Sequence, residues 1–174
     1  MNKYYFQKSL SHKECDFLIN YHKKYFNLEK PISRYSRGKP LSERWRDNDT
    51  LALPYSSPFH IRKNLLRKKA HKIVSNVLPG CTLFTDQIVR WNVNSQMEMH
   101  FDTFDVKSIT EMQKYWSIIF YLNDEYEQGE TIVENEKIKP VKGDSFLFKS
   151  SVIKHGVNQV LGTRYTYIAW WQEN

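Results

Sequence analysis

The chain contains 174 residues, 40% of them hydrophobic and 15% aromatic, and carries a formal net charge of +7. This amount of apolar material is typical of a single domain with its own core. The two cysteines, Cys15 and Cys81, are too few for a disulfide framework, and no apolar stretch is long enough for a signal peptide or a membrane span. We therefore expect one soluble, cytoplasmic domain over residues 1–174, with no membrane partner.

The positive charge is concentrated in the N-terminal part of the chain. Residues 1–80 contain 17 Lys/Arg and 6 Asp/Glu, whereas residues 81–174 contain 9 and 13. This balance would suit an anionic partner such as nucleic acid, but basic helix faces often contact only solvent. Nucleic acid is therefore the less favoured partner, and the charge alone does not identify the substrate.

The first predicted helix covers residues 11–25. Ser11-His-Lys-Glu14 has the spacing of a capping box, in which the serine hydroxyl and the glutamate carboxylate bond to free amides at a helix start. Apolar residues then recur at helical spacing and predict a buried face. That face consists of Phe17, Leu18, Tyr21 and Tyr25. Residues 29–58 have no sustained periodicity and predict a long loop region with at most short strands.

A second helix is predicted over residues 58–78, before Pro79-Gly80 ends the pattern. It combines an apolar stripe with a basic face. The stripe consists of Ile61, Leu65, Leu66, Ala70, Ile73, Val74 and Val77. The basic face consists of Arg62, Lys63, Arg67, Lys68, Lys69 and Lys72. A solvated face is favoured over a phosphate-binding one, because amphipathic helices commonly keep their charges in water.

After Gly80 the sequence changes to short runs that are rich in β-branched and aromatic residues. The predicted strands cover residues 86–92, 97–102, 115–122, 130–133, 145–148, 155–160 and 164–171. Seven short strands after two helices predict an α+β, mainly β fold, in which an antiparallel jelly-roll barrel has the N-terminal helices packed outside. In this division, residues 1–80 supply the helices and the loop, and residues 81–174 supply the barrel core.

One strand carries two candidate metal ligands. His100 and Asp102 are two residues apart and point to the same face of a strand, while Phe101 points to the other face. His155, at the start of a later strand, is the candidate third ligand. Two histidines and one carboxylate that leave coordination positions open are typical of non-haem iron(II) oxygenases. The other histidines, interpreted as structural or surface residues, are His12, His22, His60 and His71.

Arg164 follows His155 by one strand and a turn at Gly162. A buried guanidinium requires a paired anion, and a dicarboxylate co-substrate would supply one through bidentate pairing. Thr166, Ile168 and Trp170 share the face of Arg164 in the predicted strand and would form a mixed polar and aromatic wall. The alternative is an exposed arginine on an edge strand.

These motifs, in this order, resemble the iron(II)- and 2-oxoglutarate-dependent dioxygenases, and most closely the prolyl 4-hydroxylase-like branch. The resemblance covers residues 87–171 and implies a double-stranded β-helix of the cupin-like type. Its motifs are Gln87-Ile-Val-Arg-Trp, His100-Phe-Asp102, Tyr121-Leu-Asn, Gly129-Glu-Thr131, Lys139-Pro-Val-Lys-Gly-Asp-Ser-Phe-Leu-Phe148, His155-Gly-Val and Gly162-Thr-Arg-Tyr-Thr-Tyr-Ile-Ala-Trp170. The helix at Ser11 also looks like the opening helix of that branch.

The resemblance implies a role for each matching residue. His100, Asp102 and His155 would hold Fe(II) as the catalytic centre, and Arg164 would pair with the distal carboxylate of 2-oxoglutarate. Thr131 and Trp170 would help to line the co-substrate site. Dioxygen is the second co-substrate, succinate and carbon dioxide are the co-products, and ascorbate is an optional reductant.

The chain also departs from the family pattern at four positions, one of which is Gln128, where a glycine is common before Gly129. Trp91 and Met97 stand where many relatives carry tyrosines, which leaves open whether these positions bond to the co-substrate. Arg164 stands where collagen-type prolyl hydroxylases usually have lysine, and arginine at this spacing resembles the intracellular oxygen-sensing type.

Three functions remain open from the sequence. Hydroxylation of a peptidyl proline is favoured, because the resemblance points to that branch, and a protein or peptide is then the substrate. Oxidation of nucleic acid or of a small molecule is the second, although Trp170 stands where the nucleic-acid demethylase branch has a further arginine. A non-catalytic β-barrel binding module is the third. Two segments, residues 32–55 and 103–114, are expected to flank the barrel mouth and select the substrate. The oligomeric state stays open.

Overall fold

The computed structural model describes residues 2–25, 35–36, 39–40, 45–52, 60–102 and 114–174. In these parts the chain forms two helices and a predominantly antiparallel set of strands. In chain order they are β1 (Lys3–Phe6), α1 (His12–Tyr25), β2 (Tyr35–Ser36), β3 (Lys39–Pro40), β4 (Trp45–Ala52), α2 (His60–Ser75), β5 (Thr82–His100), β6 (Tyr115–Tyr121), β7 (Glu127–Gln128), β8 (Thr131–Val133), β9 (Glu136–Ile138), β10 (Ser145–Phe148), β11 (His155–Val157), β12 (Val160–Leu161) and β13 (Arg164–Gln172).

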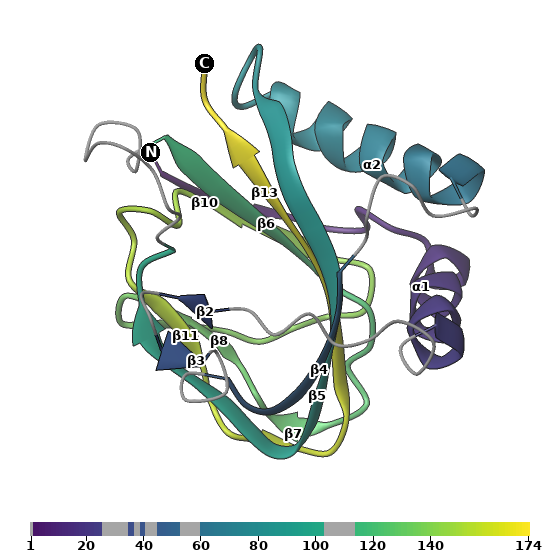
Figure 1. Cartoon of the computed structure of the whole chain (residues 1–174), viewed down its shortest axis with the longest axis vertical. Coiled ribbons are helices and arrows are strands. Elements are labelled where there is room, and N and C mark those ends of the chain that lie inside the picture. Colours follow the sequence, from purple (N-terminus) through teal and green to yellow (C-terminus); the bar gives the residue numbers. More distant parts are fainter. Residues whose placement is uncertain (1, 26–34, 37–38, 41–44, 53–59, 103–113) are drawn as a thin grey trace.

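The main sheet curls back on itself in the order β1-β10-β6-β13-β5-β11-β8-β9, and β4 also pairs with β5 (Figure 1). The long strand β5 connects the two halves, because its residues 82–91 pair with β13 and its residues 97–100 pair with β11. All of these pairings are antiparallel. The curled antiparallel sheet confirms the predicted mainly β, double-stranded β-helix architecture.

Both helices pack on the outer side of the curled sheet (Figure 1). Alternation along β13 separates two cores, since successive side chains of a strand point to opposite faces. Tyr165, Tyr167 and Trp171 join the outer cluster with buried residues of α1 and α2. Ile168 and Trp170 join the inner cluster, inside the curl. This alternation also turns Arg164 inward, which is the orientation that the candidate site requires.

The start of α1 confirms the predicted capping box. The Ser11 backbone N–H donates to Glu14 Oε2 at 2.7 Å, and the Glu14 N–H donates to Ser11 Oγ at 3.3 Å. Leu18 and Tyr21 are buried as predicted, whereas Phe17 and Tyr25 are only partly buried. Two further buried residues, Cys15 and His22, were not assigned to this face from the sequence.

The prediction for α2 was wrong at two positions. Leu65, placed on the apolar stripe, is 61% exposed, while Leu66, Ala70 and Val74 form the buried face. Arg67, placed on the solvated basic face, is only 7% exposed, because it reaches a carboxylate that the sheet provides behind the helix. The Arg67 guanidinium donates to both oxygens of Asp86 at 2.6 and 2.5 Å.

The predicted strands at 115–122, 145–148 and 164–171 correspond to β6, β10 and β13 within a residue. The strands predicted separately at 86–92 and 97–102 are one continuous strand, β5. The predicted strand at 155–160 is split into β11 and β12. The short edge strand β1 was missed, and so was β9. Neither helix is both long and apolar enough to cross a bilayer, as far as the described residues show.

Candidate metal and co-substrate site

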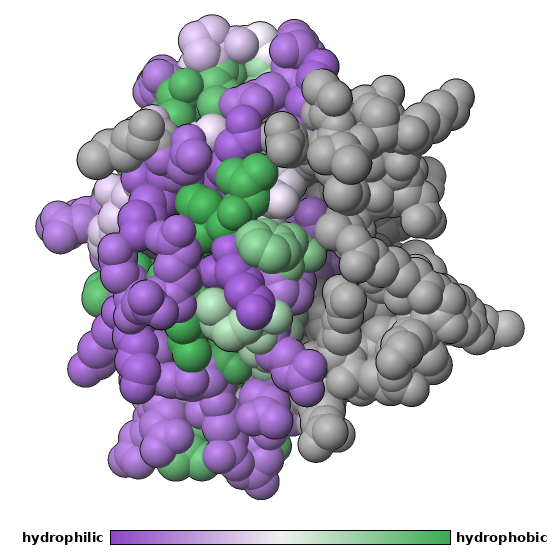
Figure 2. Space-filling view, turned by 90° about the vertical axis from the view of Figure 1, so that its left-hand side faces the viewer, coloured by the Kyte–Doolittle hydropathy of each residue, from purple (hydrophilic) through white to green (hydrophobic). Residues whose placement is uncertain are grey.

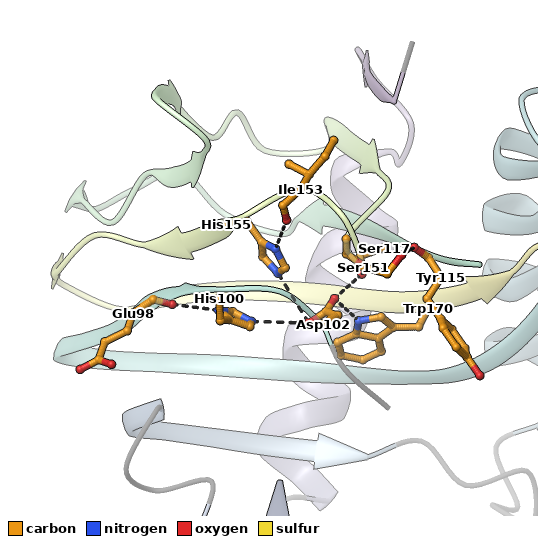
Figure 3. Close-up of polar contacts among 10 residues, drawn as sticks. Glu98, His100, Asp102, Tyr115, Ser117, Ser151, Ile153, His155 and Trp170 are labelled. Atoms are coloured by element: carbon orange, nitrogen blue, oxygen red, sulfur yellow. Dashed lines mark hydrogen bonds and ion pairs between the residues drawn. The ribbon is translucent and has the colours of Figure 1, made fainter. Parts of the chain in front are cut away.

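Three side chains converge inside the curled sheet. His100 ends β5, Asp102 follows two residues later, and His155 begins β11 directly opposite His100 in the antiparallel register. The Nε2 atoms of His100 and His155 lie 3.5 and 3.6 Å from Asp102 Oδ1, and one ligand atom from each residue lies within 4.8 Å of the others. Figure 3 shows both imidazoles directed at the carboxylate. The structure therefore brings together the three ligands that the sequence predicted.

The second nitrogen of each imidazole is held by the backbone. His100 Nδ1 lies 2.8 Å from the Glu98 carbonyl oxygen, and His155 Nδ1 lies 3.1 Å from that of Ile153 (Figure 3). A carbonyl oxygen only accepts, so each Nδ1 carries the proton. The Nε2 atoms then present lone pairs to the same point, as metal-binding histidines do.

Asp102 is held by its other oxygen. Oδ2 accepts hydrogen bonds from Ser117 Oγ and from the Trp170 indole N–H, both at 2.7 Å. The Asp102 backbone N–H donates to the Ser150 carbonyl at 3.0 Å, and Ser117 Oγ lies 2.6 Å from Ser150 Oγ. These contacts leave Oδ1 facing the imidazoles. The sequence offered no signal for Ser117, which lies on a fully buried strand.

The electrostatics of the three groups keep Asp102 ionised. Burial by itself would raise the pKa of Asp102, but the neighbouring imidazoles lower it well below its usual range. Burial by itself would lower the pKa of His155, and the Asp102 carboxylate raises it instead. The carboxylate is therefore ionised near neutral pH, as a metal ligand must be.

Loss of the indole contact should weaken metal binding. We expect Trp170→Phe, which keeps the ring packing but removes the donor to Asp102, to lower metal affinity about tenfold, because groups that orient a ligand typically contribute about 10–100-fold. Ser117→Ala should act in the same direction. Titration of the metal-free protein with manganese(II) measures both effects, and Trp171→Phe, on the outer face of the same strand, is the matched control.

Arg164 begins β13 and is 1% exposed. Its Nη2 donates to Thr131 Oγ1 at 2.9 Å, and the guanidinium carbon lies 5.1 Å from the Trp91 ring centroid and 5.8 Å from that of Tyr121. The Tyr121 hydroxyl donates to the same Thr131 oxygen at 3.1 Å. The guanidinium is therefore enclosed by two aromatic rings and one threonine.

Two atoms of this guanidinium, Nε and Nη1, are buried and have no hydrogen-bond partner among the described residues. A buried cation without an anion is costly, so the arrangement fits a carboxylate that enters from the interior. Thr131 lies opposite Val157, two residues along β11 from His155, which corresponds to about 7 Å along a strand. The separation suits a short dicarboxylate that reaches from the cluster to Arg164.

The two halves of the site thus fit iron(II) and 2-oxoglutarate. Two imidazoles and one carboxylate would provide three ligands to a metal ion and leave the other positions for co-substrates. The residues predicted beside Arg164 lie in two places. Thr131 contacts the guanidinium, whereas the Trp170 indole is placed on Asp102, and a contact of Trp170 with the co-substrate stays a prediction.

The remaining sequence predictions lie away from this cluster. His22 is buried against Tyr165, and His12 and His71 are exposed. The predicted substrate segment 103–114 lies outside the described residues except for Lys114, as does half of 32–55. Trp91 donates its indole N–H to Thr166 Oγ1 at 3.1 Å, so this donor is already used within the protein.

Comparison with known proteins agrees with this geometry. Residues 87–172 match the family model of the 2OG-Fe(II) oxygenase superfamily. No curated protein sequence matches the chain. Among solved structures, it resembles the viral collagen prolyl hydroxylase of Paramecium bursaria Chlorella virus 1 in complex with 2-oxoglutarate (TM-score 0.75, 20% identity, 100% of this chain and 97% of that one).

Two further structures share the fold at lower identity. One is a prolyl hydroxylase of Trichoplax adhaerens in complex with a peptide fragment of hypoxia inducible factor (TM-score 0.79, 14% identity, 99% and 84% of the two chains). The other is HygX of Streptomyces hygroscopicus with nickel and 2-oxoglutarate bound (TM-score 0.71, 12% identity, 99% and 83%). The family match, the curled sheet and the His-Asp-His cluster together place this chain in the 2OG-Fe(II) oxygenase superfamily, as a dioxygenase that depends on iron(II), 2-oxoglutarate and dioxygen.

Proposed function

We propose that this dioxygenase hydroxylates a peptidyl proline, with His100, Asp102 and His155 as the iron ligands and Arg164 as the anchor of 2-oxoglutarate. The observation that carries the proposal is the position of the three ligands beside a buried guanidinium with two unpartnered nitrogens. The choice of proline rests on the similar structures, because two of the three described above are prolyl hydroxylases and one of them contains a peptide.

In this proposal the role of the protein is to hold the metal and the co-substrate in position. Iron(II) with 2-oxoglutarate supplies the chemistry that activates dioxygen and yields succinate and carbon dioxide. The Nε2 atoms of the two histidines and Oδ1 of Asp102 would hold the metal, and Ser117 with Trp170 keeps Asp102 in the required orientation. The inner apolar cluster, which includes Phe146, Phe148 and Ile153, keeps water away from the reacting centre.

Exposed apolar side chains occur close to the metal ligands in the sequence. In the sequence, Phe101 lies between His100, which ends β5, and Asp102, and it is 43% exposed; Val152, three residues before His155, is 39% exposed. On the face that lies on the left of Figure 1, hydrophobic side chains interrupt a largely hydrophilic surface (Figure 2). Such side chains would contact the ring of a proline, which has no charge to pair.

A peptide screen tests the proposal. The purified protein with iron(II), 2-oxoglutarate and a library of proline-containing peptides is expected to form succinate and to add one oxygen atom to proline, as located by fragmentation mass spectrometry. Both products should disappear in His100→Ala and in Arg164→Ala, because the first loses a ligand and the second loses the partner of the distal carboxylate. Oxygen added only to other residue types would contradict the choice of proline.

Oxidation of nucleic acid receives less support from the described part of α2. Arg67 is buried and neutralised by Asp86, so it is not available to a phosphate backbone, and Lys69 already pairs with Glu14 at 2.8 Å. Weak binding of single-stranded DNA and RNA, with little dependence on salt, is the expected outcome for a protein that acts on peptides.

A further inference from the structure

Tyr126 directly precedes β7 and packs its ring against the inner apolar cluster. Its hydroxyl oxygen is buried and has no hydrogen-bond partner among the described residues. Buried hydroxyl groups nearly always have a partner, since removal from water is costly. The function proposed above gives this hydroxyl no role.

Two glycines leave space for Tyr126. A Cβ atom at Gly162 would lie 2.9 Å from the Tyr126 Cβ, and one at Gly129 would lie 3.4 Å from the Tyr126 ring. Both glycines also have positive φ angles, +125° and +70°. Glycine at both positions therefore leaves room for Tyr126, whose ring packs against the inner apolar cluster.

The same strand pairing brings Tyr126 to Arg164. Leu161 of β12 pairs with Glu127 of β7, so Tyr126 lies beside Gly162, two residues before Arg164. Burial raises the pKa of the Tyr126 hydroxyl, and the Arg164 guanidinium opposes that rise through its charge and through a side-chain contact with the hydroxyl. Three buried donors that lack a well-formed hydrogen bond thus occur together: the Tyr126 hydroxyl and two nitrogens of Arg164.

The neighbouring donors are already used within the protein. Tyr121 donates to Thr131, and Trp91 donates to Thr166. We propose that Tyr126 closes the co-substrate site at the Arg164 end, where its hydroxyl donates a hydrogen bond to the distal carboxylate and its ring sets the chain length of the 2-oxo acid. This inference rests on the role of Arg164 in the proposed function. It makes Tyr126 a residue that determines co-substrate specificity.

Calorimetric titration tests this role without turnover. With manganese(II) in place of iron(II), we expect Tyr126→Phe to weaken 2-oxoglutarate binding roughly tenfold, which is typical for one hydrogen bond to a charged group. The metal-free variant should unfold at the same or a higher temperature than the unchanged protein, because the lost hydroxyl has no partner in the fold. Tyr25→Phe, on the outside of the sheet, is the matched control and should bind 2-oxoglutarate normally.

A second experiment varies the chain length of the ligand. Tyr126→Ala should favour the longer acid 2-oxoadipate, because its additional methylene would fill the vacated space. The ratio of the dissociation constant of 2-oxoadipate to that of 2-oxoglutarate should fall roughly tenfold. An unchanged affinity in Tyr126→Phe, or an unchanged ratio in Tyr126→Ala, would overturn the inference. If Arg164→Ala also binds 2-oxoglutarate normally, the co-substrate role of Arg164 fails as well.

Discussion

His155→Ala is expected to abolish succinate formation from 2-oxoglutarate. His155 is 4% exposed, lies opposite His100 and supplies one of three metal ligands in the proposed centre. Loss of a group that only orients a ligand typically costs about 10–100-fold in metal affinity, and loss of a ligand should cost more than that. The measurement is succinate formed at saturating iron(II), together with the midpoint of thermal unfolding with and without manganese(II).

Bound metal stabilises only the folded state, so manganese(II) should raise the unfolding temperature of the unchanged protein. The rise should be lost in His155→Ala. His71→Ala, at an exposed position of α2, is the matched control and should retain both the rise and the turnover. Normal succinate formation in a folded His155→Ala protein would exclude His155 as a ligand and would require a different metal site.

The site could be anticipated because its main residues lie in short motifs. His100 and Asp102 are two residues apart, and Arg164 follows His155 by one strand and a turn, so strand geometry alone relates the members of each pair. Ser117 and Tyr126 could not be anticipated in this way. Ser117 acts by donating a hydrogen bond to Asp102, and Tyr126 is brought close to Arg164 by the pairing of β7 with β12. These contacts form only when the sheet closes, so no local sequence pattern indicates them.

In the fold as well, features set by local sequence patterns were predicted, and features set by distant contacts were not. The capping box at Ser11 and the apolar periodicity of β13 are local patterns, and both were predicted correctly. The strand β1 has only four residues and is ordered by pairing with β10, more than a hundred residues later. The solvated position predicted for Arg67 was wrong for a related reason. Nothing near Arg67 in the sequence indicates that Asp86 of β5 lies behind it.

The buried pair of Arg67 and Asp86 should therefore contribute strongly to stability. We expect Asp86→Ala to lower the free energy of unfolding by about 3–5 kcal/mol, because it leaves a guanidinium buried without its carboxylate. Asp86 also accepts a hydrogen bond from the Tyr167 hydroxyl at 2.9 Å, which would lose its acceptor. Equilibrium unfolding in urea measures the change.

A double variant separates the pair from simple loss of packing. Arg67→Met with Asp86→Leu replaces both charges by apolar groups, and such replacements of buried ion pairs are often neutral or stabilising. The double variant should therefore be clearly more stable than Asp86→Ala, and it should still form succinate, because Asp86 faces α2 rather than the metal cluster. A double variant as unstable as Asp86→Ala would mean that the shape of the two side chains, and not their charge, holds α2 on the sheet.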